Sequence, residues 1–319
     1  MLARCLGVVS AVIVLMGNTA LAADNPGEWV PLFNGTDLSG WKVRNDKYTV
    51  TKFLDADGKE IKGARKGKVD QKETVVDAKN KPIEGAKVAK VGGKETAVDA
   101  EGKPIKGAKI LKSGGRDAIL GADGKEITGA KAVTEQMSNP TGGWKVESGV
   151  LICGTGPRGS DIYTEKKFTD YELHVEFQAT SNSGVYPHGL YEIQIDNSKN
   201  VKPMIVEKDG KKIEMFPKGM CGALYGRVAP SKNMAKDPKE WQTFDITFRA
   251  ARSEGKKIKE KARISVVWNG EKVIDNVEID GPTGGNLGVS QTEPGPVMLQ
   301  GDHGRVSFRN IKIRPLAAK

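Results

Sequence analysis

One short stretch, Asn182 to Asp196, brings acidic, amide and imidazole side chains close together in the sequence. Its first part is rich in turn-forming residues, and Leu190 to Asp196 then alternates as a β-strand does. In that alternation Glu192 and Gln194 share one face. A carboxylate beside an amide is costly to bury unless water or a ligand meets both groups. The stretch therefore indicates either a solvated outer face or a binding site.

Three residues are candidates for acid–base chemistry. Glu192 is the first candidate for a general base, or for a ligand to a divalent cation. His188, in the loop before the strand, is the second, because an imidazole titrates near neutrality. Glu176 lies on an earlier predicted strand and could face Glu192 if the two strands pair. Gln194 is expected to orient a substrate hydroxyl.

Three further residues are candidates for substrate binding: Arg158, Tyr225 and His303 could donate hydrogen bonds to a substrate oxygen. Each candidate also has a structural interpretation, since Glu176 could belong to a solvated face and Tyr225 could be a buried phenol. No close pair such as His-x-x-x-His supports a metal cluster. A divalent cation as cofactor therefore stays an open question, and the metal is unknown.

The elements that must position these residues are strands. Extended segments with period-two alternation recur along the chain, separated by Gly, Asn and Asp turns, and no helix of ten or more residues is predicted. About a dozen such strands favour an all-β, two-layer antiparallel sandwich. The clearest predicted strands are 171–178, 241–248, 263–268, 272–279 and 305–313.

The composition changes between residues 44 and 140. The run that starts at Asp55 recurs from Asp77, from Asp99 and, more loosely, from Gly121, at a spacing of 22 residues. This period indicates an inserted tandem array of short β-hairpins. Each repeat has few large apolar residues, so the array either stacks on itself or on the main domain, or is only partly ordered. We expect no catalytic role for it.

The first 22 residues have the features of a secretory signal peptide. Arg4 precedes a mostly apolar run from Leu6 to Leu15, and Ala20-Leu21-Ala22 fits a cleavage site. The apolar run is too short to span a membrane comfortably. We therefore predict a secreted or periplasmic protein without an integral membrane segment, with three parts: a signal peptide (1–22), a sandwich domain (23–43 and 141–319) and the repeats (44–140).

The charge pattern limits the class of binding partner, and the cysteine content limits the possible disulfides. The formal net charge is +10, but lysines are interleaved with acids and no basic stretch carries aromatics at stacking spacing. This argues against nucleic-acid binding. Removal of the signal peptide leaves Cys153 and Cys221, which either pair in an oxidising compartment or are two small buried thiols.

A set of short motifs outside the repeats resembles one family. They occur in order across residues 28–43 and 144–316, and together they resemble the 3-keto-disaccharide hydrolase domain family. The resemblance implies a jelly-roll sandwich like that of concanavalin-type lectins and glucanases. The matching residues include Leu32-Phe33-Asn34-Gly35, Leu38-Ser39-Gly40-Trp41, Asn182-Ser183-Gly184-Val185, Tyr191-Glu192-Ile193-Gln194, Gly222-Ala223-Leu224-Tyr225 and His303-Gly304.

The resemblance implies cleavage of a glycosidic bond in a small saccharide already oxidised at C3. The ketone acidifies the C2 proton, a base removes it, and the enolate expels the C1 substituent. Three alternatives stay open: a conventional glycosidase with Glu176 and Glu192 as its carboxylate pair, a non-catalytic, lectin-like carbohydrate-binding module, and a surface adhesion protein that binds through its repeats. The sequence does not predict the oligomeric state.

Overall fold

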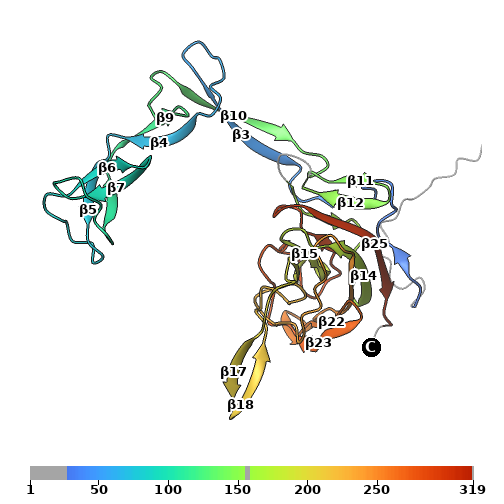
Figure 1. Ribbon diagram of the computed structural model, residues 1–319. Coiled ribbons are helices and arrows are strands. Elements are labelled where there is room, and N and C mark those ends of the chain that lie inside the picture. The colour runs from blue at the N-terminus through green and yellow to red at the C-terminus, as the bar shows by residue number, and fades with distance from the viewer. Residues whose placement is uncertain (1–26, 155–158, 318–319) are drawn as a thin grey trace, which may run out of the picture. The chain divides into compact units, whose positions relative to one another are not determined.

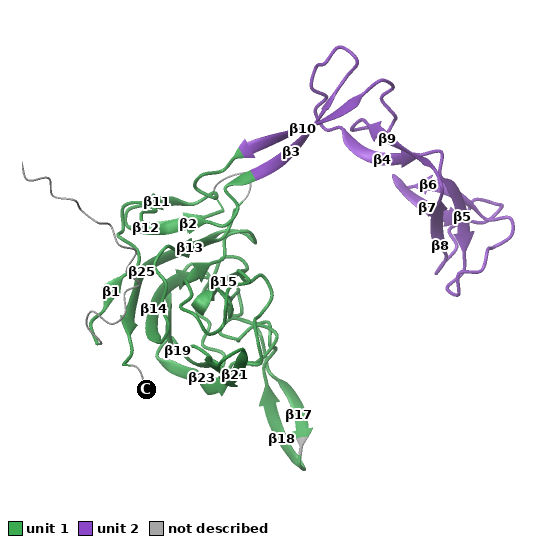
Figure 2. Ribbon diagram, turned by 180° about the vertical axis from the view of Figure 1, so that it is seen from behind, with its two compact units in different colours: residues 1–47, 138–319 green, residues 48–137 purple. Residues whose placement is uncertain are grey.

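The computed structural model describes residues 27–154 and 159–317. In this part of the chain the protein is all-β and antiparallel, as predicted, and its one helical element is a 3-10 turn at Pro187–Gly189. The predicted signal peptide lies outside the described residues. Two compact units are formed, one by residues 1–47 with 138–319 and one by residues 48–137 (Figure 2).

The larger sheet of the first unit has the strand order β11-β12-β25-β14-β19-β22-β23, and β1 pairs with β25 (Figures 1 and 2). Its central strand β14 alternates strictly, so Leu173 and Val175 are buried while Glu172 and Glu176 point outward. A bulge interrupts the pairing of β14 with β25 opposite Asn310. The strands are β1 (Val30–Pro31), β11 (Lys145–Glu147), β12 (Val150–Cys153), β14 (Tyr171–Gln178), β19 (Gln242–Arg249), β22 (Arg263–Trp268), β23 (Glu271–Glu278) and β25 (Val306–Pro315).

The smaller sheet has the order β16-β15-β24-β13-β2. Its inner face and the inner face of the larger sheet enclose one apolar core, in which Phe177, Phe244 and Trp268 are fully buried. Aromatic rings pack edge to face or tilted within it, as Phe244 and Trp268 do at 6.2 Å. The strands are β2 (Trp41–Val43), β13 (Ile162–Thr164), β15 (Ser183–Tyr186), β16 (Ile193–Ile195) and β24 (Met298–Leu299).

Two short hairpins of the first unit were not predicted. One is β17 (Met204–Lys208) with β18 (Lys211–Met215), which projects from the sandwich (Figures 1 and 2). The other is β20 (Arg252–Glu254) with β21 (Lys257–Glu260). The predicted strand Leu190–Asp196 is shorter than expected, because Pro187–Gly189 forms a turn and pairing begins only at Ile193.

In the second unit the strands pair as nested hairpins: β3 with β10, β4 with β9, β5 with β8 and, within the second repeat, β6 with β7. Each repeat also closes its own tight turn. In the second repeat, for example, the Asp77 carboxylate accepts hydrogen bonds from the backbone N–H groups of Lys79 and Lys81, and Val76 bridges to Pro82. The strands are β3 (Lys47–Leu54), β4 (Arg65–Val69), β5 (Lys72–Val76), β6 (Lys87–Val91), β7 (Lys94–Val98), β8 (Lys109–Ser113), β9 (Arg116–Leu120) and β10 (Lys131–Ser138).

Cys153 and Cys221 are both free and buried, so of the two interpretations the structure supports two separate thiols. Burial raises the pKa of Cys153 to about 11 and that of Cys221 to about 12. Both thiols are therefore protonated and unreactive at neutral pH. In the described part of the chain, no helix has the length and apolar character needed to cross a membrane.

Candidate active site

The outer face of the smaller sheet carries two cross-strand rows of polar side chains. In the first row Glu192 is the central member. Because Val185 pairs with Ile193, the next residue Tyr186 lies opposite Glu192. The bridge between Ile193 and Leu224 places Tyr225 on the other side of Glu192. Residues opposite each other across antiparallel strands are neighbours on one face, so Tyr186 and Tyr225 flank Glu192 in this row.

The second row lies two residues further along the chain from Glu192, at Gln194. Gln194 pairs with Gly184, and Gln300 follows on β24, where its N–H donates to the Gly184 carbonyl. The register of β13 then brings Asp161 and Arg44 into the same row. These side chains lie beside Glu192 on the same outer face of the sheet.

Glu192 is held firmly and is almost fully enclosed, with 4% of its surface exposed. Its N–H donates to Oγ1 of Thr283 at 2.8 Å, and its carbonyl accepts from the N–H of Tyr225 at 3.0 Å. The side chain lies over Gly184, where a Cβ atom would be only 2.8 Å from Oε1 of Glu192. A side chain at position 184 would therefore displace the Glu192 side chain from its place.

This environment raises the pKa of Glu192 to about 7, from an ordinary value of 4.5. Burial is the main cause, because a carboxylate loses its hydration there. A hydrogen bond from Tyr186 and the nearby imidazole of His303 act in the opposite direction, and Asp161 and Asp302 add to the rise. A carboxylate with a pKa near neutrality can accept a proton at physiological pH and release it again.

Two amide oxygens next to Glu192 have no hydrogen-bond partner among the described residues: Oε1 of Gln194 and Oε1 of Gln300. Both residues are buried. Their amide nitrogens are engaged, since Nε2 of Gln300 donates to the Tyr186 hydroxyl at 3.3 Å and Nε2 of Gln194 donates to the Ile195 carbonyl at 3.4 Å. Buried acceptors without partners are unusual in native proteins, and these two are suited to hydroxyl donors of a ligand.

Tyr186 connects the carboxylate with a neighbouring loop. Its hydroxyl has one proton and two acceptors in reach, the Glu192 carboxylate and the carbonyl of Gly284 at 3.2 Å. The same loop is fixed from the other side by Arg44, which bonds to the carbonyls of Gly285 and Asn286 and forms an ion pair with Asp161 at 3.0 Å. The loop is therefore held by Tyr186 of the first row and by Arg44 of the second row.

Of the residues predicted from the sequence, Glu192, Gln194, Tyr225 and His303 come together. Tyr225 is 42% exposed at the edge of the site. His303 follows β24 in a loop, where its Nδ1 contacts the Asp302 carboxylate. Arg158 lies outside the described residues.

His188 and Glu176 do not join this group. His188 is completely buried in the core, with its ring 5.4 Å from that of Phe248, and burial lowers its pKa. Glu176 belongs to the other sheet, because β14 pairs with β25 and β19 and not with the strand of Glu192. The strand pairing that would have brought Glu176 to Glu192 is therefore absent.

Four residues of these rows were not predicted from the sequence: Tyr186, Gln300, Asp161 and Arg44. Simple alternation gives a signal for the first, since Tyr186 is two residues from Gly184 in an extended segment. The other three lie at strand ends, and their place depends on the sheet order, which the sequence pattern does not specify.

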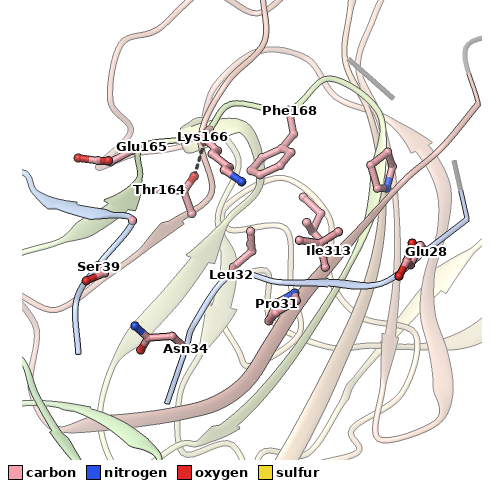
Figure 3. Close-up of a pocket in the computed structure, with 13 residues that line it drawn as sticks. Glu28, Pro31, Leu32, Asn34, Ser39, Thr164, Glu165, Lys166, Phe168 and Ile313 are labelled. Atoms are coloured by element: carbon pink, nitrogen blue, oxygen red, sulfur yellow. Dashed lines mark hydrogen bonds between the residues drawn. The ribbon is translucent and has the colours of Figure 1, made fainter. Parts of the chain in front are cut away.

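Within the described residues of the first unit, hollows lie away from Glu192. One of about 490 Å³ is lined mainly by apolar side chains, among them Leu32, Phe168 and Ile313, and includes none of the predicted site residues (Figure 3). Another of about 340 Å³ lies beside Lys42 and Tyr163. Among the residues that the structure describes, no cluster of His, Cys, Asp and Glu is arranged to hold a metal ion.

Comparison with solved structures gives distant similarities. Two proteins from Parabacteroides distasonis ATCC 8503, both provisionally named glycosyl hydrolases, are each 27% identical to the chain. One aligns over 56% of this chain and 76% of its own length with a TM-score of 0.44, the other over 54% and 90% with a TM-score of 0.37. The alginate lyase Aly36B is 11% identical over 55% of this chain and 85% of its own, with a TM-score of 0.31. No protein of curated function matches the chain.

One family profile matches more than half of the chain. The profile of the 3-keto-alpha-glucoside-1,2-lyase-like domain matches residues 117–314. This segment contains Glu192, Gln194, Tyr186 and Gln300, the residues that form the centre of the site. The chain therefore belongs to the 3-keto-alpha-glucoside-1,2-lyase-like domain family and is a carbohydrate-active protein.

Proposed function

We propose that the protein is an exported enzyme that cleaves the glycosidic bond of 3-keto-glycosides, including 3-keto-disaccharides, by removing the C2 proton. The observation that carries the proposal is Glu192, an enclosed carboxylate with a pKa of about 7 beside two unpartnered amide oxygens. A general base works best when its pKa lies near the working pH. Family membership supports the same chemistry.

In the proposed reaction the ionised Glu192 carboxylate takes the proton from C2, and the electron pair of the C–H bond moves into the C3 ketone to give an enolate. The enolate then expels the oxygen substituent at C1, which takes a proton from water, and a C1–C2 double bond conjugated with the ketone forms. Glu192 returns its proton to the solvent. Addition of water across that double bond yields the free 3-keto-sugar. No nucleophilic serine or cysteine is needed.

The neighbouring residues have separate roles in this proposal. Oε1 of Gln194 and Oε1 of Gln300 accept hydrogen bonds from sugar hydroxyls, which would satisfy both buried acceptors. Tyr225 and His303, at the edge of the site, supply donors to the enolate oxygen. Tyr186 positions Glu192 through its hydrogen bond.

Incubation with a 3-keto-disaccharide in deuterated water tests the reaction. Proton abstraction predicts glycosidic cleavage together with deuterium at C2 of the product, whereas cleavage of unoxidised disaccharides alone would identify a conventional glycosidase. Saturable sugar binding without turnover would instead identify a lectin-like module. Both of these results would contradict the proposal.

Export is a separate part of the proposal and rests on the first 22 residues. Expression of the full chain should yield a mature protein that begins at Ala23, located outside the cytoplasm. Mass spectrometry of the purified protein would show this N-terminus. A product that keeps Arg4 and stays in the cytoplasm would contradict it.

A further inference from the structure

The β17–β18 hairpin extends beyond the sandwich with both faces exposed (Figures 1 and 2). Asp209 and Gly210 both have positive φ angles, of 51° and 69°, which is the geometry of a two-residue type I′ turn. The register pairs Val206 with Ile213 and Met204 with Met215. Hairpins of two strands are marginally stable alone in water, so this one is expected to gain stability from further strands.

Away from the turn, where Lys208 pairs with Lys211, one face of the hairpin is apolar and is not covered. Met204, Met215, Val206 and Ile213 share that face, and the exposed fractions of Met204, Met215 and Ile213 are 59%, 40% and 36%. The opposite face carries charges: Glu207 pairs across the hairpin with Lys212. Among the described residues, neither outer edge of the hairpin pairs with another strand.

The outer edge of β18 has free backbone groups at defined positions. In a two-residue hairpin the residues that flank the turn form a hydrogen-bonded pair, and bonded and non-bonded pairs alternate from there. Lys211, Ile213 and Met215 therefore bond to β17. Lys212 and Glu214 turn their N–H and C=O groups toward solvent, where another strand can bond to them.

We propose that this edge of β18 pairs antiparallel with the same edge of a second copy of the chain, centred on Ile213. Such a pairing is isologous, as expected for a twofold dimer. It places Lys212 opposite Glu214 of the other copy, and Glu214 opposite the other Lys212. Both residues then exchange backbone hydrogen bonds and form charge pairs across the strands.

The same alignment joins the apolar faces. Ile213 meets its counterpart in the non-hydrogen-bonded arrangement, in which side chains approach most closely, and Val206 extends this apolar row on both sides. The outer edge of β17 offers no such match: an alignment centred on Val206 would place Ile205 opposite Glu207. Charge complementarity thus selects the β18 edge and a second copy as its partner.

Sedimentation of the purified protein over a range of concentrations tests the pairing. The unmodified protein should form a dimer that dissociates on dilution. Glu214→Lys puts like charges opposite each other and should raise the dissociation constant at least about tenfold. Lys212→Glu with Glu214→Lys, combined with Glu207→Lys so that opposite charges still pair across the hairpin, reverses the charges of the edge and should restore the dimer.

Glu254→Lys is the matched control, since it makes the same change in the other exposed hairpin, β20–β21, and should leave the dimer unchanged. Equal thermal unfolding of all variants confirms that each is folded. A monomer at every concentration would overturn the proposal. So would a dimer that persists in Glu214→Lys, or one that the combined charge reversal fails to restore.

Discussion

The outer faces of the two sheets carry similar polar patterns and have opposite environments. On β14, Glu172 and Glu176 point outward from the larger sheet and are paired with Arg314 and Arg309. On the smaller sheet, Glu192 is enclosed and has no ion pair with an Arg or Lys among the described residues. Alternation alone places acids on outer faces, but only the surroundings decide whether an acid is neutralised by a partner or left available for a ligand.

The pKa values of the two carboxyls express this difference. Burial raises the pKa of Glu176, but hydrogen bonds from Asn310 and Arg309 outweigh this effect and hold the pKa below its ordinary value. For Glu192, burial prevails and the pKa is about 7. A permanently charged, paired acid is typical of a structural surface, and a neutral-range acid with few partners is typical of a catalytic site.

The largest expected effect is on activity. Glu192→Gln should lower kcat/KM for a 3-keto-disaccharide by about 10²- to 10⁴-fold, because the general base is lost. The matched change on the other face, Glu176→Gln, should alter kcat/KM less than about twofold. Steady-state kinetics with both variants checks the comparison, and equal losses in the two would remove the distinction between the faces.

Replacing Glu192 should lower activity but increase the free energy of unfolding at high pH. The pKa of Glu192 is raised on folding, so the folded state binds more protons between pH 4.5 and 7, and stability falls as the pH rises through that range. The shift corresponds to about 3 kcal/mol. Glu192→Gln should therefore be more stable than the unmodified protein at pH 8 by up to about that amount, and the difference should vanish below pH 4.

Urea unfolding at pH 4 and pH 8 measures this difference. If Glu192→Gln is no more stable at pH 8 than the unmodified protein, Glu192 is not held in a dry environment. Glu176→Gln serves as the control and should show no gain at pH 8, because its charged form is paired with Arg309.

The amide oxygens should have an intermediate effect. Gln194→Ala and Gln300→Ala each remove one acceptor for a sugar hydroxyl, worth about 1 kcal/mol, so each should lower kcat/KM about fivefold. Gln178→Ala removes an amide from the outer face of the larger sheet, where it bonds to the Lys239 carbonyl, and should leave kinetics unchanged. Isothermal titration with a disaccharide would show whether the loss is one of binding.

The smallest effect is expected from Tyr186→Phe. The hydrogen bond from Tyr186 lowers the pKa of Glu192, so its removal should raise that pKa and move the acid limb of the kcat/KM profile to higher pH. Activity should fall a few-fold near pH 6.5 and recover at pH 8.5. A loss that is the same at both pH values would show that Tyr186 does not act through the ionisation of Glu192.

Much of the fold could be predicted because strand alternation and turn residues are local signals. The strand Arg263–Trp268 has the predicted bounds, and the faces of Glu192 and Gln194 were predicted correctly. The sheet order was not predictable from alternation, so the sequence left open whether the strands of Glu176 and Glu192 pair, and Gln300 and Asp161 were missed. The β17–β18 hairpin was missed too, although Asp209-Gly210 between apolar runs is a hairpin signal.

A carbon-13 NMR titration of the glutamate side-chain carboxyls tests the central claim most directly, because one spectrum reports both faces. Glu192→Gln and Glu176→Gln assign the two resonances. We predict a midpoint of about 7 for Glu192 and one below 4.5 for Glu176. A Glu192 midpoint at or below 4.5 would mean a solvated or paired carboxylate, and would contradict its assignment as the base.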